Sequence, residues 1–256
     1  AISNDPMGAS FEAVTLDVNQ RAAISLAQQA RAAGARGFVF ASSCSVYGFA
    51  EGGAKTEESE VNPLTAYAKS KVGAEKDLAA LASPNFAVTC LRFATACGMS
   101  ERLRLDLVLN DFVASAVTAK KITILSDGTP WRPLIHIRDM ARAIDWGVQR
   151  KPEDGGKFLS VNVGSDGWNY QVRDLATAVS KAIPNVEISI NQNAQPDKRS
   201  YRVSFERFRR LAPQYQPEMD LDAAILDLKT GLEKMGFADR EFRNSHLIRL
   251  NMLKDL

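Results

Sequence analysis

The chain has 256 residues, 45% of them hydrophobic and 24% charged, with a formal net charge of +2. This composition is ordinary for a globular protein and, at roughly 150 residues per domain, fits one large domain or two intertwined ones. The even charge balance excludes a polybasic arm or an acidic tail as the main functional feature, so we expect no nucleic-acid partner.

The sequence also argues against membrane, disulfide and metal functions. No apolar run approaches the ~18 residues that a membrane helix needs. The three scattered cysteines, Cys44, Cys90 and Cys97, do not form a disulfide framework, and with two isolated histidines they show no metal-ligand spacing. We therefore expect a cytoplasmic protein with no membrane association and no metal site.

Apolar periodicity predicts helices that alternate with short buried strands. The first half of the chain carries a helix over 11–34, a strand over 37–43, a helix over 64–82 and a strand over 86–93. Further along we expect helices over 106–120, 138–150 and 170–183, strands over 122–125, 158–164 and 186–190, and amphipathic helices near 221–236 and 240–255. Such alternation predicts a parallel sheet covered on both faces, with ligands at the carboxyl ends of its strands.

Two motifs follow the first predicted strand. S-S-C-S-V-Y-G occupies 42–48, and Y-A-K-S-K occupies 67–71 on a predicted helix. Tyr67 and Lys71 are four residues apart and so share a helix face. An ammonium beside a phenol favours the phenolate, which can then move the proton of a sugar or alcohol hydroxyl, while Ser43 can hold that hydroxyl by a hydrogen bond.

The same pair is also common on solvent-exposed helix faces, and alone it would be weak support for catalysis. Here the double serine, V-Y-G, a helix that begins near Pro63 and the Tyr-Lys pair occur in one order. That combination favours the catalytic interpretation. By contrast, we expect His136 to be a packed strand residue, His246 to lie on the surface of a terminal helix and Cys44 to be a small buried thiol.

Four segments together resemble the extended short-chain dehydrogenase/reductase family, the NAD-dependent nucleotide-sugar epimerases and dehydratases, which include UDP-galactose 4-epimerase. They are F-V-F-A-S-S-C-S-V-Y-G (38–48), N-P-L-T-A-Y-A-K-S-K (62–71), V-T-C-L-R-F-A-T-A-C-G (88–98) and L-S-D-G-T-P-W-R-P-L-I-H-I-R-D-M-A-R-A (125–143). The second segment is the most specific.

The resemblance implies an α/β fold with a Rossmann-like, doubly wound parallel sheet and a smaller α/β substrate domain at the C-terminal end. Residues 1–96 and about 132–165 would form a partial NAD(P)-binding domain, intertwined with a substrate-binding domain of about 97–131 and 166–256. It also implies a homodimer formed through the helices near 11–34 and 64–82.

The family's functional residues match this chain one by one. Catalytic roles fall on Ser43, Tyr67 and Lys71; cofactor contacts fall on Asn19, Ser42, Tyr67, Lys71, Phe93, Ala94 and Thr95; substrate contacts fall on Ser43, Thr95, Arg132 and Arg199. Asn19 matches a residue that is more structural than catalytic. Thr95 stands where 4-epimerases usually have a substrate-binding Asn. A guanidinium fork suits a nucleotide diphosphate, although a surface salt bridge is the alternative for each arginine.

The implied reaction is epimerisation of a nucleotide-diphosphate sugar: hydride passes from a sugar carbon to NAD and returns to the other face, with Tyr67 as acid and base. NADP stays open as the cofactor. Family dehydratases usually follow the catalytic Ser or Thr with Asp-Glu, whereas Cys44-Ser45 follows Ser43 here. A reductase or dehydratase of the same family and a non-catalytic remnant or interaction module remain as alternatives.

The family's Gly-rich cofactor fingerprint is the one motif that does not match. No G-x-G-x-x-G or G-x-x-G-x-x-G occurs in the 256 residues. Because that fingerprint holds the cofactor pyrophosphate, we expect a fragment that lacks the N-terminal strands and binds cofactor weakly. The strand at 37–42 would then lie at an open edge of the sheet.

Overall fold

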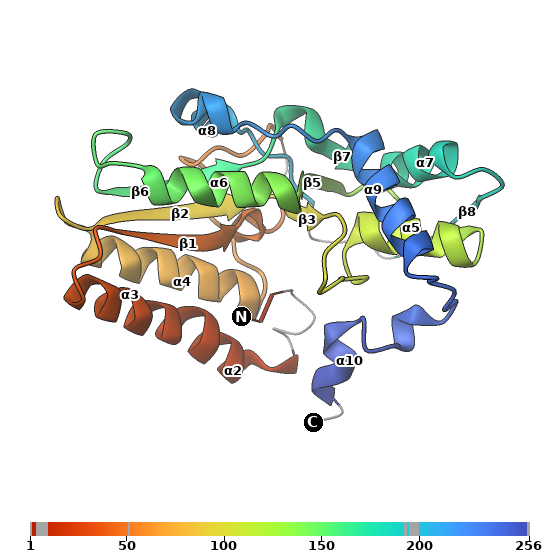
Figure 1. Ribbon diagram of the computed structural model, residues 1–256, viewed down its shortest axis with the longest axis horizontal. Coiled ribbons are helices and arrows are strands. Elements are labelled where there is room, and N and C mark those ends of the chain that lie inside the picture. Colours follow the sequence, from red (N-terminus) through yellow and green to blue (C-terminus); the bar gives the residue numbers. More distant parts are fainter. Residues whose placement is uncertain (1, 4–9, 51, 192–193, 195–199, 255–256) are drawn as a thin grey trace.

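The main sheet of the protein has three parallel strands in the order β1 (Gly37–Ser43), β2 (Ala87–Phe93) and β6 (Phe158–Val163). A computed structural model describes residues 2–3, 10–50, 52–191, 194 and 200–254 (Figure 1). All seven residues of β2 are buried, as expected for a central strand of a sheet covered on both faces. Among the described strands, β1 has one hydrogen-bonded neighbour, β2.

Helices cover both faces of this sheet (Figure 1). On one side lie α4 (Ala66–Leu81) and a continuous helical segment made of α2 (Glu12–Leu16), the π-helical turn η1 (Asp17–Arg21) and α3 (Ala22–Ala32). The other side is covered by α6 (Ile137–Gln149), where Trp146 meets Phe208 edge-on at 5.5 Å between ring centroids. This arrangement confirms the predicted α/β class and places the carboxyl ends of β1 and β2 at one edge.

A second group of elements packs around its own apolar core. It contains the parallel pair β4 (Lys121–Ile124) and β8 (Glu187–Ile190), and the sheet β3 (Thr95–Cys97), β5 (Trp131–His136) and β7 (Asn169–Gln171). Its main helices are α5 (Val108–Thr118), α7 (Val172–Ala182) and α9 (Leu221–Lys234). The division of the chain into two intertwined domains stays a prediction.

The remaining elements are short. They are the 3₁₀ turns η2 (Cys44–Tyr47), η3 (Asp166–Trp168), η4 (Pro213–Tyr215) and η5 (Phe242–Asn244), and the helices α8 (Glu206–Leu211) and α10 (Arg249–Lys254). No helix in the described part of the chain combines the length and the apolar character that crossing a bilayer requires.

The predicted helix over 240–255 is wrong in its first half. Ser245 is extended, with its Oγ donating to the Phe242 carbonyl at 2.6 Å, and Asn251 Nδ2 donates to the Ser245 carbonyl at 3.2 Å. These local bonds compete with helical ones, so the helix begins only at Arg249. His246 is exposed, as predicted, but lies in this turn rather than on a helix. The short strands β3 and β7 were not among the predicted elements.

Gly48 fixes the path of the chain between β1 and α4. It ends η2 with φ +62°, and a Cβ atom at this position would lie 2.0 Å from the Asn62 carbonyl oxygen. Only glycine combines this backbone conformation with such a close approach. The turn after Ser43 is thereby held against the residues that lead into α4.

We expect Gly48→Ala to lower the free energy of unfolding by about 1–3 kcal/mol, because the added methyl group must displace backbone at a positive φ. Urea unfolding followed by circular dichroism measures this. Gly53→Ala is the matched control, since nothing lies within 4 Å of its added Cβ. Equal losses in the two variants would contradict the assignment.

Candidate active site

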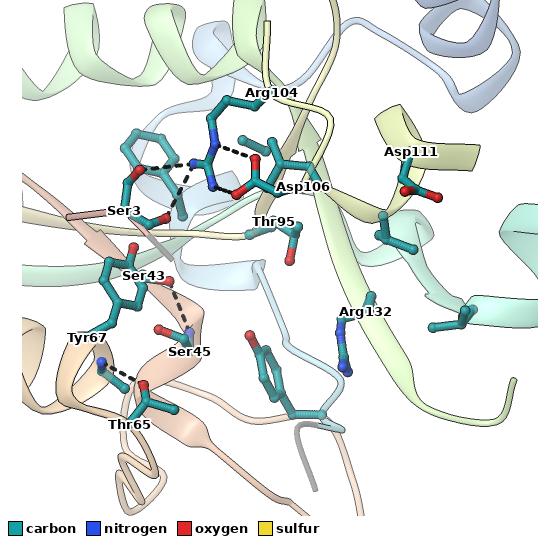
Figure 2. A pocket seen from close by; sticks show the side chains of 18 of the residues that line it. Ser3, Ser43, Ser45, Thr65, Tyr67, Thr95, Arg104, Asp106, Asp111 and Arg132 are labelled. Atoms are coloured by element: carbon teal, nitrogen blue, oxygen red, sulfur yellow. Dashed lines mark hydrogen bonds and ion pairs between the residues drawn. The ribbon is translucent and has the colours of Figure 1, made fainter. Parts of the chain in front are cut away.

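A cavity of about 810 Å³ opens at the carboxyl ends of β1 and β2. Its walls come from β1 and η2, the start of α4, the end of β2, the loop before α5, and the ends of β4 and β5 that face them. Eight predicted site residues line it: Ser42, Ser43, Tyr67, Lys71, Phe93, Ala94, Thr95 and Arg132. Figure 2 shows Ser43 and Tyr67 together on one side of this cavity and Arg132 on the other.

Helix α4 brings Tyr67 and Lys71 to the cavity. The Thr65 side chain caps the helix by accepting a hydrogen bond from Ala68 N at 3.1 Å, and Pro63 stands just before it. Both features are typical of a helix start. The buried face of the helix carries small residues such as Ala66 and Ala68, so its first turns lie close to the end of β1.

Lys71 is buried beneath Tyr67, with 6% of its surface exposed. Its Nζ donates to the Ala41 carbonyl at 2.7 Å and lies 5.6 Å from the centre of the Tyr67 ring and 4.6 Å from that of Phe40. Burial lowers the pKa of Lys71 to about 8, and the nearby Glu75 opposes that shift. The predicted ammonium–phenol pair is therefore present as a geometric unit.

The hydroxyl of Ser43 faces the cavity where β1 ends. Its Oγ accepts a hydrogen bond from Ser45 N at 3.1 Å, which caps η2 (Figure 2). Ser45 also lines the cavity, and its buried Oγ has no hydrogen-bond partner among the described residues. Sequence reasoning missed Ser45, although it stands only two residues after the predicted Ser43.

The other predicted cofactor residues have different environments. Ser42 lines the cavity, but its hydroxyl donates to Glu75 Oε1 at 2.5 Å. Phe93, Ala94 and Thr95 line the cavity where the chain passes from β2 to β3, and their contact with a cofactor stays a prediction.

Asn19 does not appear among the described residues that line the cavity. Its amide exchanges two bonds with the Ile2 main chain, at 2.9 and 2.7 Å, and donates to Ser70 Oγ at 3.3 Å. Asn19 thus joins the start of the chain to α4, in line with the predicted structural role, and a cofactor contact stays a prediction.

Arg132 lies at the start of β5, and its Nη1 donates to the neighbouring Trp131 carbonyl at 2.9 Å. Tyr201, 7% exposed, also lines the cavity, and Arg202 stacks its guanidinium 5.2 Å from the Trp131 ring. The other predicted arginine, Arg199, lies outside the described residues.

Two ion pairs in the cavity wall were missed by sequence reasoning. Arg104 pairs with Asp106 at 2.6 Å and donates to Ser3 Oγ at 3.1 Å (Figure 2). Arg243 pairs with Asp111 at 2.6 Å. Ser3 and Arg243 are each more than 100 residues from their partners in the chain. No local motif could have identified these contacts.

No cysteine or histidine is among the described residues that line the cavity. Cys44 is 1% exposed and its thiol donates to the Arg92 carbonyl at 3.1 Å. Burial raises the pKa of this thiol far above its usual value, so it stays protonated. His136 is a buried strand residue, as predicted. Throughout the described residues, no group of three or more metal-ligating side chains comes together.

Comparison with known proteins places this geometry in a family. The sequence profile of the NAD dependent epimerase/dehydratase family matches residues 1–164. UDP-glucose 4-epimerase of Haemophilus influenzae is 33% identical over 175 residues, which cover 61% of this chain and 51% of that protein. The uncharacterized UDP-glucose epimerase YtcB of Bacillus subtilis is 33% identical over 129 residues, covering 50% of this chain and 39% of its own length. The chain thus spans about half the length of the curated relatives it matches, or less.

Solved structures share the fold at lower identity. The NAD dependent NDP-hexosamine 5,6-dehydratase TunA of tunicamycin biosynthesis superposes with a TM-score of 0.77 at 24% identity, covering 93% of this chain and 76% of that chain. UDP-glucose 4-epimerase of Stenotrophomonas maltophila, solved with bound NAD and formylated UDP-arabinopyranose, superposes with a TM-score of 0.77 at 20% identity. The superposition covers 92% of this chain and 75% of that chain. These similarities confirm the predicted Rossmann-like fold. Since the family profile matches more than half of its residues, the chain belongs to the NAD dependent epimerase/dehydratase family.

Proposed function

We propose that this chain carries the proton-transfer and substrate-binding residues of an NAD-dependent nucleotide-sugar epimerase. The observation that carries the proposal is the buried Lys71 ammonium beneath Tyr67, beside Ser43, at one wall of the cavity. Burying a lysine is costly, because the charged form loses its hydration. A surface helix face would not need that arrangement.

The three catalytic side chains have different tasks in this scheme. Tyr67 takes the proton of a sugar hydroxyl and later returns it. Lys71 supplies the positive charge that favours the phenolate form of a neighbouring tyrosine. Ser43 orients the same hydroxyl through a hydrogen bond, and Ser45 offers a second hydroxyl in the same wall.

The residues at the carboxyl ends of β1 and β2 fit the nicotinamide-ribose end of NAD. Lys71 can bond the ribose hydroxyls, and Phe93, Ala94 and Thr95 border the space for the nicotinamide ring. When bound, NAD supplies the hydride acceptor. No Gly-rich pyrophosphate fingerprint occurs within these 256 residues, so the fit concerns that end of the cofactor alone. NADP fits it equally, because the two cofactors differ at the adenosine ribose.

Arg132 is the proposed contact for the diphosphate of the substrate. It faces the cavity from the side opposite Tyr67 (Figure 2), and a guanidinium matches phosphate oxygens in geometry and charge. Tyr201 lines the same cavity. A sugar held between Tyr67 and Arg132 would present its hydroxyls to Ser43 and Thr95, which supports a nucleotide-diphosphate sugar as the substrate class.

Among reactions of the family, epimerisation is favoured over dehydration by Cys44. Dehydratases usually carry an acidic pair directly after the catalytic Ser or Thr. Here the first of those positions is a thiol that is buried and bonded to the main chain. The Cys44 thiol therefore provides no second acid or base in the cavity. Dehydration needs such a second group, whereas epimerisation needs only one acid–base residue.

We expect Tyr67→Phe to lower the turnover of UDP-hexoses in the presence of NAD by at least about 100-fold, because the proton-transfer group is lost. Its unfolding midpoint should match that of the wild type. Tyr215→Phe is the control, since its hydroxyl bonds Gln149 at the C-terminal end of α6, and neither residue is among those described as lining the cavity. An active Tyr67→Phe variant would refute the catalytic assignment, and a folded wild type with neither NAD binding nor turnover would favour the non-catalytic alternative.

We also propose that the chain forms a homodimer through α2, α3 and α4. Val14, Val18 and Leu26 on this helical segment are 48%, 43% and 59% exposed. Large apolar side chains exposed along one helix are typical of an interface.

The wild type should therefore sediment at about twice its mass of 28.0 kDa, and Leu26→Glu should shift it towards the monomer. Burying a charged carboxylate in an apolar interface opposes association. Leu226→Glu on α9 is the matched control, because Leu226 is 60% exposed away from these helices. A Leu26→Glu protein that stays dimeric would place the interface elsewhere.

A further inference from the structure

A buried carboxylate lies directly below the proposed catalytic pair. Glu75 is 6% exposed and stands one helical turn after Lys71 on α4. Tyr67, Lys71 and Glu75 are spaced by four residues, so they follow one another along the same helix face. The proposed chemistry needs Tyr67 and Lys71 but leaves Glu75 without a role.

The carboxylate of Glu75 contacts all three strands of the main sheet. Ser42 on β1 donates to Oε1 at 2.5 Å, and Ser160 on β6 donates to Oε2 at 3.2 Å. Arg92 on β2 makes a two-pronged contact, with Nη2 2.7 Å from Oε2 and Nε 3.0 Å from Oε1. Such bidentate, charge-assisted pairs fix geometry strongly.

The same network continues to the far side of Ser43. Arg92 Nη1 donates to the Tyr47 hydroxyl at 3.1 Å, and that hydroxyl donates to Asn162 Oδ1 at 2.7 Å. Ser43 therefore lies between two residues that this network holds by hydrogen bonds, Ser42 on β1 and Tyr47 at the end of η2. Its hydroxyl can hold a fixed position at the cavity although its own side chain makes few contacts.

Glu75 is also the carboxylate whose charge acts on Lys71 and favours its protonated form. On α4 the ionisable groups that face Lys71 are Tyr67 and Glu75. From β1 it meets the Ala41 carbonyl and the Phe40 ring, neither of which carries a charge. From β2 it faces Cys90, and burial raises the pKa of that thiol, which keeps it neutral; the Arg92 cation is bonded to Glu75 itself. Removing the charge of Glu75 would leave two buried cations without an anion.

We propose that Glu75 is a positioning residue whose charge keeps Lys71 protonated beneath Tyr67 and whose two oxygens hold the ends of β1 and β2 at the cavity. The expected effect of Glu75 on the reaction rate rests on the proposed function. The expected effect of Glu75 on Lys71 is independent of that function, because the protonation of Lys71 can be measured without cofactor, substrate or turnover.

The test is a titration of Lys71 in protein labelled with carbon-13 at lysine Cε, followed by NMR from about pH 6 to about pH 11. The Lys71 resonance is the one missing from Lys71→Met. In the wild type it should titrate at about 8. In Glu75→Gln, which keeps the shape but removes the charge, the midpoint should fall by about 1 pH unit.

Ser160→Ala is the matched control, since it removes one hydrogen bond to Glu75 and leaves the charge in place. Its Lys71 midpoint should equal that of the wild type, as should that of Glu75→Asp, which retains the charge on a shorter side chain. An unchanged midpoint in Glu75→Gln overturns the proposal. If Glu75→Gln does not fold, a fall of the same size in Glu75→Asp overturns it. A chain without turnover would refute the proposed function and leave these titrations unaffected.

Discussion

One buried ion pair, between Glu75 of α4 and Arg92 of β2, holds the helix with the proposed acid–base residues against the sheet. Its carboxylate also accepts from Ser42 and Ser160, so a single side chain touches all three parallel strands. Breaking a buried pair of this kind typically costs about 3–5 kcal/mol, because one charge is left without its partner. This contact joins the helix that carries Tyr67 and Lys71 to the strands whose carboxyl ends border the cavity.

The cavity separates two kinds of chemistry in space. On the α4 side, a buried cation lies beneath a phenol, an arrangement suited to moving a hydroxyl proton. On the β5 side, Arg132 offers a guanidinium suited to phosphate oxygens. Between them lie hydroxyls from Ser43, Ser45 and Thr95. A ligand with an anionic tail and a hydroxylated ring would contact both sides at once, which supports the proposed nucleotide-diphosphate sugar over a small alcohol.

Local sequence signals predicted the part of this site that local structure builds. Strand β1, the Pro-initiated helix α4 and strand β2 each follow from a short pattern, and parallel strands bring their carboxyl ends to one edge. Pairs such as Arg104 with Ser3 and Arg243 with Asp111 depend on the meeting of distant segments, for which the chain has no local signal. Glu75 was missed for a related reason: a single glutamate on a helix is usually exposed, and only the packed sheet shows that it is buried.

The most direct test of the account is calorimetric titration of the chain with UDP, because it examines the substrate side of the cavity without any cofactor. Saturable binding is predicted, and Arg132→Ala should weaken it by about tenfold or more, the usual effect of losing a charged hydrogen bond. Arg21→Ala, which removes an exposed guanidinium on η1, should bind like the wild type. Equal affinity in the wild type and Arg132→Ala would contradict the placement of the diphosphate and, with it, the orientation of the sugar towards Tyr67.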